Sequence, residues 1–442
     1  MKGATMFKQK IHRIIFLAVT VILFILIPIA IHYSDQTDRL DNKPFLITEH
    51  DNIHEKVDPK DFGAVGDGIT DDTKALQAWL DAPGKNKVLK NGVFKITSGL
   101  RSSEAGRTIK TDGAVIIADT ANMIMLTVTG EQSIVSVDLN GNNKAAGGIL
   151  ILGDGCQVQN SKIDNIYGSN QTAFGIKAQT SNGVLIEQST IKNIRGTKNG
   201  KFGDNIGASR AILVTSKEAA SKPNIIRNNS IDGVTGEEGD AIQFLFNNGQ
   251  VTFLNAQGMI ENNMIKNCNR RAIKVQASNV KILNNTHINT LSKDDLPHAA
   301  NLIDIIHSNF IIVQGNKLDA TFFLGISLSG DSTRKASGIL VKGNIIQGGL
   351  VLLDGRRVTA SGIYWNNITD SQIIANSIAD AVIPISGANG TNITVADNRF
   401  WGGDGLYPAI NILSSNTNIH ISDNKQMAGR RSTLIRNNSL EQ

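Results

Sequence analysis

Short runs of alternating apolar and polar residues fill most of this chain, and one phrase returns in them: aliphatic, two residues, asparagine, one residue, aliphatic. Full copies cover residues 226–231, 260–265, 313–318, 341–346, 373–378 and 395–400, and looser copies are centred on Ser161, Ser189, Asn285 and Asn424. The alternation predicts strands, and the asparagine suits a bend that needs a left-handed backbone conformation. The spacing of 22 to 40 residues is typical of a solenoid, because one unit cannot bury its apolar face without neighbours.

A second phrase, a small residue or leucine followed by isoleucine, precedes most copies. It occurs at Gly175-Ile176, Ala211-Ile212, Ala241-Ile242, Ala272-Ile273, Leu302-Ile303, Gly325-Ile326, Gly362-Ile363 and Ala409-Ile410. Each unit therefore has at least two strands. An antiparallel sandwich is the alternative, but sandwiches do not reuse one bend residue at one offset. The pattern predicts an all-β right-handed parallel β-helix solenoid of about ten coils.

The N-terminal region predicts a single-pass membrane anchor. Residues 14–31 are an uncharged apolar run, preceded by lysines and an arginine and followed by aspartates, which predicts a cytoplasmic N-terminus. A cleaved signal peptide is the alternative, although the run is long for one and Pro28-Ile29-Ala30 is a poor cleavage site. Both interpretations place the β-helix outside the cytoplasm, in the periplasm or outside the cell.

The predicted organisation has five parts. They are a cytoplasmic segment (1–13), a transmembrane signal-anchor (14–32), a polar stalk (33–56), the β-helix domain (57–430) and a C-terminal tail (431–442).

The amino-acid composition and net charge argue against one class of binding partner, nucleic acids. The chain has 442 residues, of which 5% are aromatic, and a net charge of +5 without a basic tract, so we expect no nucleic-acid partner. Cys156 and Cys268 should lie several coils apart, beyond disulfide reach, as free cysteines. Whether copies associate into a homo-oligomer is left open.

A short helix is expected just before the solenoid. Thr70 is its predicted N-cap, Asp71 and Asp72 complement its positive end, and Leu76, Trp79 and Leu80 form one apolar stripe. Such a helix would cover the open end of the first coil.

The same segment carries a family resemblance. It reads Asp61-Phe62-Gly63-Ala64-Val65-Gly66-Asp67-Gly68, followed by Thr70-Asp71-Asp72. It resembles the start of pectate-lyase-like superfamily β-helix domains of the rhamnogalacturonase-like and epimerase-like kind, related to glycoside hydrolase family 28. With the repeats, the resemblance covers roughly residues 55 to 427. It implies a carbohydrate ligand, but the family includes hydrolases, lyases, epimerases and binding proteins, so it does not name the reaction.

Aligning the second phrase predicts which side chains become neighbours, because equivalent positions in successive coils stack about 4.8 Å apart. Asp240 falls between Arg210 and Arg271, and Lys274 falls between Gln243 and Asp304. We predict catalytic roles for Asp240, Arg271, Lys274 and Asp304, and substrate-binding roles for Arg210, Gln243, His298 and His307. Loops at residues 246–258, 288–300 and 327–337 could wall a groove beside them. The alternative is a charge ladder on a solvated face that only stabilises the stack.

The reaction class is narrowed by comparison with polygalacturonase-type glycosidases. Their motif Gly-Asp-Asp-Cys-Ile is matched at residues 238–242 with only the second aspartate, Asp240, kept, and Arg271 stands where their following coil carries histidine. Inverting hydrolysis needs two carboxyls roughly 6.5 to 9.5 Å apart. Asp240 and Asp304 have opposite parity along their strands, which predicts different faces. A lyase or C5-epimerase of an exopolysaccharide or cell-wall glycan is therefore favoured over a hydrolase.

Two further points stay open. An anionic polysaccharide would suit Arg271 and Lys274 as cations for a uronate carboxylate, and an acidic cluster of Asp232, Glu237, Glu238 and Asp240 would allow a Ca²⁺ ion. The alternative function is a non-catalytic polysaccharide-binding or scaffold protein.

Overall fold

The computed structural model describes residues 58–197, 207–216, 220–246, 255–290, 301–319, 324–348, 352–353, 356–357, 361–403 and 405–438. The predicted cytoplasmic segment, anchor and stalk lie outside these ranges. Among the helices within these ranges, none is long and apolar enough to cross a membrane.

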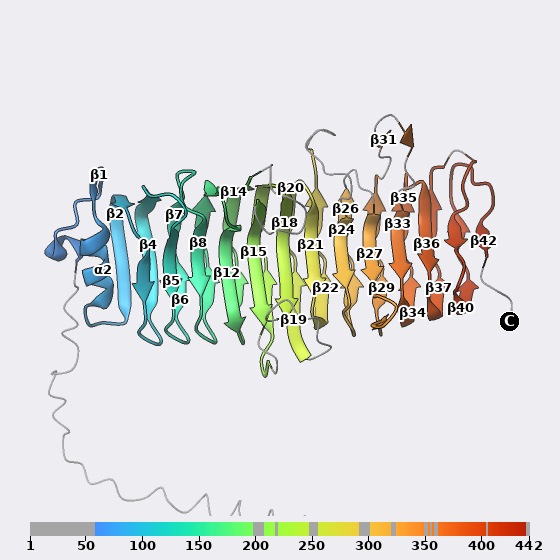
Figure 1. Ribbon diagram of the computed structural model, residues 1–442, viewed down its shortest axis with the longest axis horizontal. Helices are drawn as coiled ribbons and strands as arrows, with labels where there is room; N and C mark the ends of the chain where they lie inside the picture. Colours follow the sequence, from blue (N-terminus) through green and yellow to red (C-terminus); the bar gives the residue numbers. More distant parts are fainter. Residues whose placement is uncertain are drawn as a thin grey trace, which may run out of the picture. The chain divides into compact units, whose positions relative to one another are not determined.

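The described chain is a right-handed parallel β-helix, and Figure 1 shows its strands stacked side by side from the helix α2 (Thr73–Asp81) to the C-terminal end. Sheet B holds 13 parallel strands, so the described solenoid has more coils than the ten predicted. Its strands are β3 (Leu100–Ser102), β5 (Ile124–Val128), β8 (Gly147–Ile151), β12 (Ala173–Ser181), β15 (Ala208–Ser216), β18 (Glu238–Phe246), β21 (Arg271–Gln276), β24 (Asn301–Ile306), β27 (Leu324–Ser329), β33 (Ser361–Asn366), β36 (Ile383–Ala388), β39 (Ile410–Ile412) and β42 (Ile435–Asn437).

Sheet A holds 27 described strands, and most of them fall into two rows joined at the asparagine bend. The row before the bend comprises β6 (Ile134–Ser136), β9 (Gln157–Gln159), β13 (Leu185–Glu187), β16 (Asn224–Arg227), β19 (Asn255–Glu261), β22 (Ser278–Leu283), β25 (Ile312–Gln314), β28 (Ala336–Ser337), β29 (Leu340–Lys342), β34 (Ile368–Ile374), β37 (Thr391–Ala396) and β40 (Thr417–Ser422). The row after it comprises β7 (Asp138–Asn140), β10 (Lys162–Asp164), β11 (Ile166–Gly168), β14 (Thr190–Gly196), β17 (Ser230–Thr235), β20 (Met264–Cys268), β23 (Thr286–Ile288), β26 (Lys317–Asp319), β30 (Ile345–Gln347), β35 (Ser377–Ala379), β38 (Arg399–Trp401) and β41 (Lys425–Gln426). The sheet begins with β1 (Asp67–Asp71), β2 (Asn86–Ile96) and β4 (Thr108–Ala118), and a separate antiparallel pair joins β31 (Leu352–Leu353) and β32 (Arg356–Arg357).

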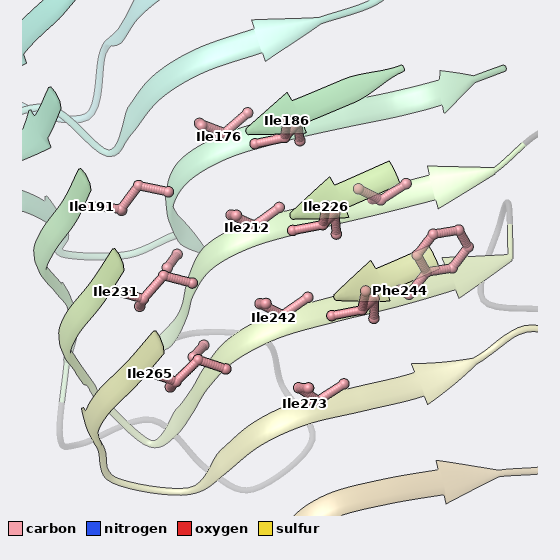
Figure 2. Close-up of a cluster of buried hydrophobic side chains, with 14 of the residues drawn as sticks. Ile176, Ile186, Ile191, Ile212, Ile226, Ile231, Ile242, Phe244, Ile265 and Ile273 are labelled. Carbon is pink, nitrogen blue, oxygen red and sulfur yellow. The ribbon is translucent and has the colours of Figure 1, made fainter. Parts of the chain in front are cut away.

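Isoleucine columns fill the interior. In sheet B, Ile212 pairs with Ile242 and Ile242 with Ile273, and in sheet A Ile231 pairs with Ile265. Figure 2 shows these columns facing one another across the coil. Each fully buried isoleucine contributes about 1.5 to 3 kcal/mol of transfer free energy, so the stack depends on keeping this register.

The small residue of the second phrase also faces the interior. A Cβ added to Gly175 would lie 2.7 Å from Ile191 Cγ2, and one added to Gly362 would lie 2.6 Å from Ile378 Cγ2. The paired register skips this position, for example between Phe174 and Ile176. The small residue and the following isoleucine are therefore two consecutive inward residues, and the residues on either side of them both point outward.

A ladder of buried asparagines joins successive coils at the bend between the two rows of sheet A. Asn316 Oδ1 accepts hydrogen bonds from the backbone N–H of Asn285 at 2.9 Å and from its Nδ2 at 3.0 Å, and Asn316 Nδ2 donates to Asn344 Oδ1 at 3.0 Å and to Ile282 O at 3.0 Å. The same pattern links Asn229, Asn263, Asn285, Asn316, Asn344, Asn376, Asn398 and Asn424. Ser161 and Ser189 continue the column toward the N-terminus.

The prediction that the fixed asparagine itself is left-handed was wrong. The preceding residue takes that conformation instead, as at Asn228 (φ 56°), Asn262 (φ 54°) and Gly315 (φ 68°). That bend turns the following asparagine side chain inward, where it satisfies backbone groups of its own and the adjacent coils.

A short helix lies in the predicted segment before the solenoid, but its N-cap residue differs from the predicted one. After the 3₁₀ turn η1 (Pro59–Phe62), helix α2 (Thr73–Asp81) buries Leu76, Trp79 and Leu80. The predicted N-cap, Thr70, lies instead in β1, and the N-cap is Asp72. The Asp72 carboxylate accepts the N–H groups of Val65 at 2.7 Å and Gly66 at 3.1 Å, so it secures the loop before the helix.

The C-terminal end extends past the predicted boundary at residue 430. Strand β42 pairs with β39 in sheet B, so part of the predicted tail belongs to the solenoid. Cys156 and Cys268 are both free and buried, as predicted.

One histidine interrupts the apolar interior. His287 occupies the column between Ile265 and Leu318 and is 1% exposed. Its Nε2 lies 3.1 Å from Cys268 Sγ, while its Nδ1 has no hydrogen-bond partner among the described residues. Burial lowers the pKa of His287 to about 4 from 6.5.

Replacing Asn316 with alanine should destabilise the solenoid by about 3 to 5 kcal/mol, because donors and acceptors in both adjacent coils lose buried partners. Denaturant unfolding followed by circular dichroism measures the effect. The control is Gln314→Ala, which removes an exposed side chain from β25, the strand directly before the bend of Asn316, and should change the unfolding free energy by about 0.5 kcal/mol or less. Equal effects of the two variants would contradict a stabilising ladder.

His287→Leu should raise stability and reduce its dependence on pH. The folded pKa of about 4 lies below the ordinary 6.5, so the unfolded chain binds the additional proton and stability falls as pH drops from about 6.5 to 4. Thermal unfolding between pH 4 and pH 7 tests this. The leucine variant should show a smaller decline than the original chain, and an identical decline would assign the acid sensitivity to other groups.

Candidate functional site

The outer face of sheet B brings the predicted residues into two neighbouring columns. The first column holds Phe174, Arg210, Asp240 and Arg271. The second holds Lys177, Leu213, Gln243, Lys274, Asp304, Ser327, Tyr364, Ser386 and Asn411. The alignment made from the small-residue phrase is thus the register of the sheet.

Asp240 and Asp304 share one face, contrary to the expectation from their parity. The two inward residues Ala241 and Ile242 follow Asp240, and the equivalent pair precedes Asp304, so both carboxyls point outward. Arg271 binds both: its Nη1 donates to Asp240 Oδ1 at 3.1 Å and its Nε donates to Asp304 Oδ2 at 2.8 Å.

Arg210 extends this chain of ion pairs toward the N-terminus. Its Nη2 lies 3.4 Å from Asp240 Oδ2 and 3.1 Å from Glu238 Oε2, and its Nε donates to the side-chain oxygen of Gln243. The arrangement Arg210, Asp240, Arg271, Asp304 alternates in sign along the solenoid. We call these four residues the ion ladder.

Asp240 is the buried centre of the ion ladder, with no exposed surface. Burial opposes its ionisation, but Arg210 and Arg271 outweigh burial and hold the pKa of Asp240 below its ordinary value. The carboxylate is therefore charged and enclosed between two guanidinium groups. This geometry suits a group that positions its neighbours and does not suit one that exchanges protons with a ligand.

Arg271 is also kept charged. Burial works against its charge, yet Asp240 and Asp304 raise the pKa of Arg271 above its ordinary value. Its Nε and Nη1 are used by the two aspartates, and its Nη2 makes no hydrogen bond within the described part of the chain. The side chain is 8% exposed, so one donor edge of the guanidinium remains for a ligand oxygen.

Lys274 lies beside the ion ladder and is half-buried. Burial is the main reason that the pKa of Lys274 falls below its ordinary 10.5, and Arg271 adds to the decrease while Asp240 opposes it. Its position in the second column places it between Gln243 and Asp304. A larger share of neutral amine is therefore present near neutral pH than in a free lysine.

The structure describes only one of the two predicted histidines, His307, and the ion pair of His307 is made outside the ion ladder. His307 directly follows the strand of Asp304, but its Nδ1 lies 3.5 Å from Asp331 Oδ2 in the turn after β27. His298, like most of the loops at 246–258 and 288–300, lies outside the described residues. The third predicted loop, residues 327–337, is described throughout, and the turn that carries Asp331 joins the end of β27 to β28 within it.

The acidic cluster considered for Ca²⁺ is not assembled. Asp240 and Glu238 are bound by arginines, and Asp232 Oδ1 accepts a hydrogen bond from Asn267 at 3.0 Å. In the described ranges, no group of three or more histidine, cysteine or acidic side chains is placed to hold a metal ion.

Tyr364 and Lys177 are two further residues of the second column that are not among the candidate site residues predicted from the sequence. Both project from the second column and are half-buried, and burial raises the pKa of Tyr364 above its ordinary value. The sequence contains the signal, because Tyr364 follows Gly362-Ile363 at the same offset at which Asp304 follows Leu302-Ile303.

Comparisons with known proteins agree with this architecture. A family described as right handed beta helix region matches residues 147–346. Mannuronan C5-epimerase AlgE5 of Azotobacter vinelandii is 36% identical over 75 residues, a match that spans 16% of this chain and 8% of the epimerase.

Two solved structures share the fold at low sequence identity. The surface adhesin PfbA of Streptococcus pneumoniae aligns with a TM-score of 0.59 and 16% identity over 86% of this chain and 99% of the adhesin. A PL6 alginate lyase, solved in complex with a trisaccharide, aligns with a TM-score of 0.55 and 13% identity over 83% of this chain and 86% of the lyase.

Asp240→Asn should destabilise the protein by about 3 to 5 kcal/mol, because it leaves two buried guanidinium groups facing a neutral amide. Denaturant unfolding gives the value. The matched control is Asp370→Asn on β34, an exposed aspartate whose change should cost about 0.5 kcal/mol or less. If both variants unfold at the same denaturant concentration, the ion ladder contributes nothing to stability.

Proposed function

We propose that this chain, a right-handed parallel β-helix of the pectate-lyase-like superfamily, binds an acidic polysaccharide on the outer face of sheet B and moves a proton at the uronate C5. This step is common to polysaccharide lyases and C5-epimerases. The observation that carries the proposal is the half-buried Lys274, whose pKa is lowered by burial, next to the unused donor edge of Arg271.

The chemistry needs a base and a cation. Removing the C5 proton places negative charge on the uronate carboxylate, and a nearby guanidinium stabilises that charge. We assign Arg271 to the carboxylate and neutral Lys274 to the proton. If the bond between C4 and its oxygen then breaks, a C4–C5 double bond forms and the leaving oxygen takes a proton from the Lys274 ammonium group or from water, as in a lyase. If water on the opposite face of C5 returns a proton instead, the product is the epimer and the Lys274 ammonium group loses its proton to solvent.

Asp240, Asp304 and Arg210 act as positioning residues in this scheme. Asp240 and Asp304 hold two donor atoms of Arg271, which orients its third nitrogen. Arg210 holds Asp240 and Gln243 in turn. The direct acid or base role expected for Asp240 from the sequence is replaced by this indirect one, because Asp240 has no exposed surface.

A hydrolase is disfavoured by the same contacts. Inverting and retaining glycosidases both need a protonated carboxyl at the scissile oxygen. Asp240 and Asp304 each bind Arg271, and the pKa of Asp240 is lowered. Neither carboxyl of the ion ladder is therefore suited to donate a proton to a leaving sugar.

The sequence match to a mannuronan C5-epimerase supports an acidic glycan as substrate and C5 as the reacting carbon. We also propose that the β-helix works outside the cytoplasm, next to the membrane that residues 14–32 would span. Extracellular or cell-wall glycans are the polysaccharides available in that compartment.

A non-catalytic glycan-binding protein is the second candidate. It is favoured by the closed ion ladder, in which Asp240 and Asp304 are 0% and 3% exposed and already satisfied by arginines. Such a protein would bind glycan without changing it.

The proposal is tested with the purified protein and a panel of acidic and neutral polysaccharides, with and without Ca²⁺. Absorbance of unsaturated uronate, reducing ends and hydrogen exchange at C5 distinguish a lyase, a hydrolase and an epimerase. Binding without any of the three signals would support the second candidate. Absence of both binding and turnover for every acidic glycan would refute the proposal.

Lys274→Met should lower kcat by about 10²- to 10⁴-fold, because it removes the proton acceptor. In the unmodified protein, kcat should rise with pH through an apparent pKa below 10.5, since neutral lysine is the active form. The matched control is Lys266→Met, which changes an exposed lysine on β20 in sheet A and should leave kcat unchanged. Full activity of Lys274→Met would show that Lys274 is not the residue that accepts the C5 proton.

A further inference from the structure

We infer that the outer face of sheet B holds an extended glycan segment along the solenoid axis, with Lys177 and Tyr364 as contacts on either side of Lys274. This inference rests on the proposed function and adds the length of the recognised segment. It also adds two residues that determine affinity.

The positions of the two residues follow from the register. Lys177 lies three coils from Lys274 through Leu213 and Gln243, and Tyr364 lies three coils from Lys274 in the other direction through Asp304 and Ser327. At about 4.8 Å per coil, each is about 14 Å from Lys274 and the two are about 29 Å apart. Lys274 is thus at the middle of a continuous column, and a ligand reaching both ends must be an oligosaccharide.

Tyr364 has the features of a sugar-stacking residue. Its neighbours along the strand, Ile363 and Trp365, are fully buried, so the tyrosine ring points outward. Its neighbours in the column are the small residues Ser327 and Ser386. Tyrosine suits a wet surface because its ring packs against C–H groups while its hydroxyl meets water or sugar hydroxyls.

The Tyr364 hydroxyl supports the same role. It makes no hydrogen bond to any residue in the described ranges, although the side chain is half-buried. A half-buried hydroxyl with an unused donor and acceptor suits a sugar hydroxyl as its partner.

Lys177 offers a cation for a ligand carboxylate. Its Nζ lies 5.9 Å from the centre of the Phe174 ring, and no carboxylate of the described chain lies within ion-pairing distance of it. The side chain is half-buried, and burial lowers the pKa of its ammonium group. A half-buried cation without an anionic partner gains from an incoming carboxylate, which restores the favourable charge balance.

The surface between these two ends is compatible with an anionic chain. Along the second column from Lys177 to Tyr364 the single acidic residue is Asp304, and it is held by Arg271 at 2.8 Å. The other column members are Leu213, Gln243, Lys274 and Ser327. A polyanion laid along this column therefore meets two lysines and no unpaired carboxylate.

The experiment measures binding of a uronate hexasaccharide and a uronate disaccharide to the full protein by titration calorimetry. Lys177→Met and Tyr364→Ala should each lower the ratio of hexasaccharide to disaccharide affinity by about tenfold, because only the longer ligand reaches the changed residues. Tyr364→Phe should retain part of the ratio, since it keeps the ring and removes the hydroxyl. The matched controls are Lys192→Met and Tyr167→Ala on sheet A, which should not change either affinity.

Each outcome separates this inference from the proposed function. If the original protein binds and converts uronates, but Lys177→Met and Tyr364→Ala keep the original affinity ratio, the extended site is wrong and the role of Lys274 stands. If neither oligosaccharide binds the original protein, the proposed function fails and this inference fails with it. Circular dichroism of each variant confirms that a lost ratio is not caused by unfolding.

Discussion

The register between successive coils is the constraint on which the rest of this structure depends, and the buried asparagine ladder helps to hold it. Isoleucine columns supply most of the transfer free energy, but apolar packing alone is weakly directional. Each asparagine adds directional bonds, because its amide nitrogen donates to both adjacent coils and its amide oxygen accepts from the preceding coil, as at Asn316. A slip of one residue would leave these buried amides without partners, so the ladder discriminates against incorrect registers.

The same register assembles the surface chemistry. Since each coil adds one side chain to every outward column, residues far apart in sequence become neighbours one coil apart. The members of the ion ladder, Arg210, Asp240, Arg271 and Asp304, come from four successive strands of sheet B, and their charges balance. The buried carboxylates of that ladder orient Arg271, whereas Lys274 beside it is only half-buried. The proposed function on this face therefore depends on the same repeat that stabilises the fold.

How far the sequence predicted this arrangement differs from residue to residue. The pairing of Asp240 with Arg271 and of Lys274 with Asp304 followed from the repeated phrase, because a parallel stack converts equal offsets into contacts. The shared face of Asp240 and Asp304 did not follow, since simple alternation does not include two consecutive inward residues. The left-handed residue before each asparagine and the replacement of Thr70 by Asp72 as N-cap likewise depend on backbone geometry that alternation does not encode. The place of Tyr364 in the second column could be predicted from its offset after Gly362-Ile363. A single tyrosine in a sequence, however, does not indicate that it contacts a ligand.

The stacking of outward residues into columns on sheet B has a consequence for how such a face can change. Distances along a column are multiples of the coil rise, so a point substitution alters what a position contributes but not where it lies. The separation of two contacts changes only when an entire repeat is gained or lost between them. Ligand length and ligand chemistry are thus set by separate kinds of mutation: duplication or deletion of coils for the first, and exchange of outward side chains for the second.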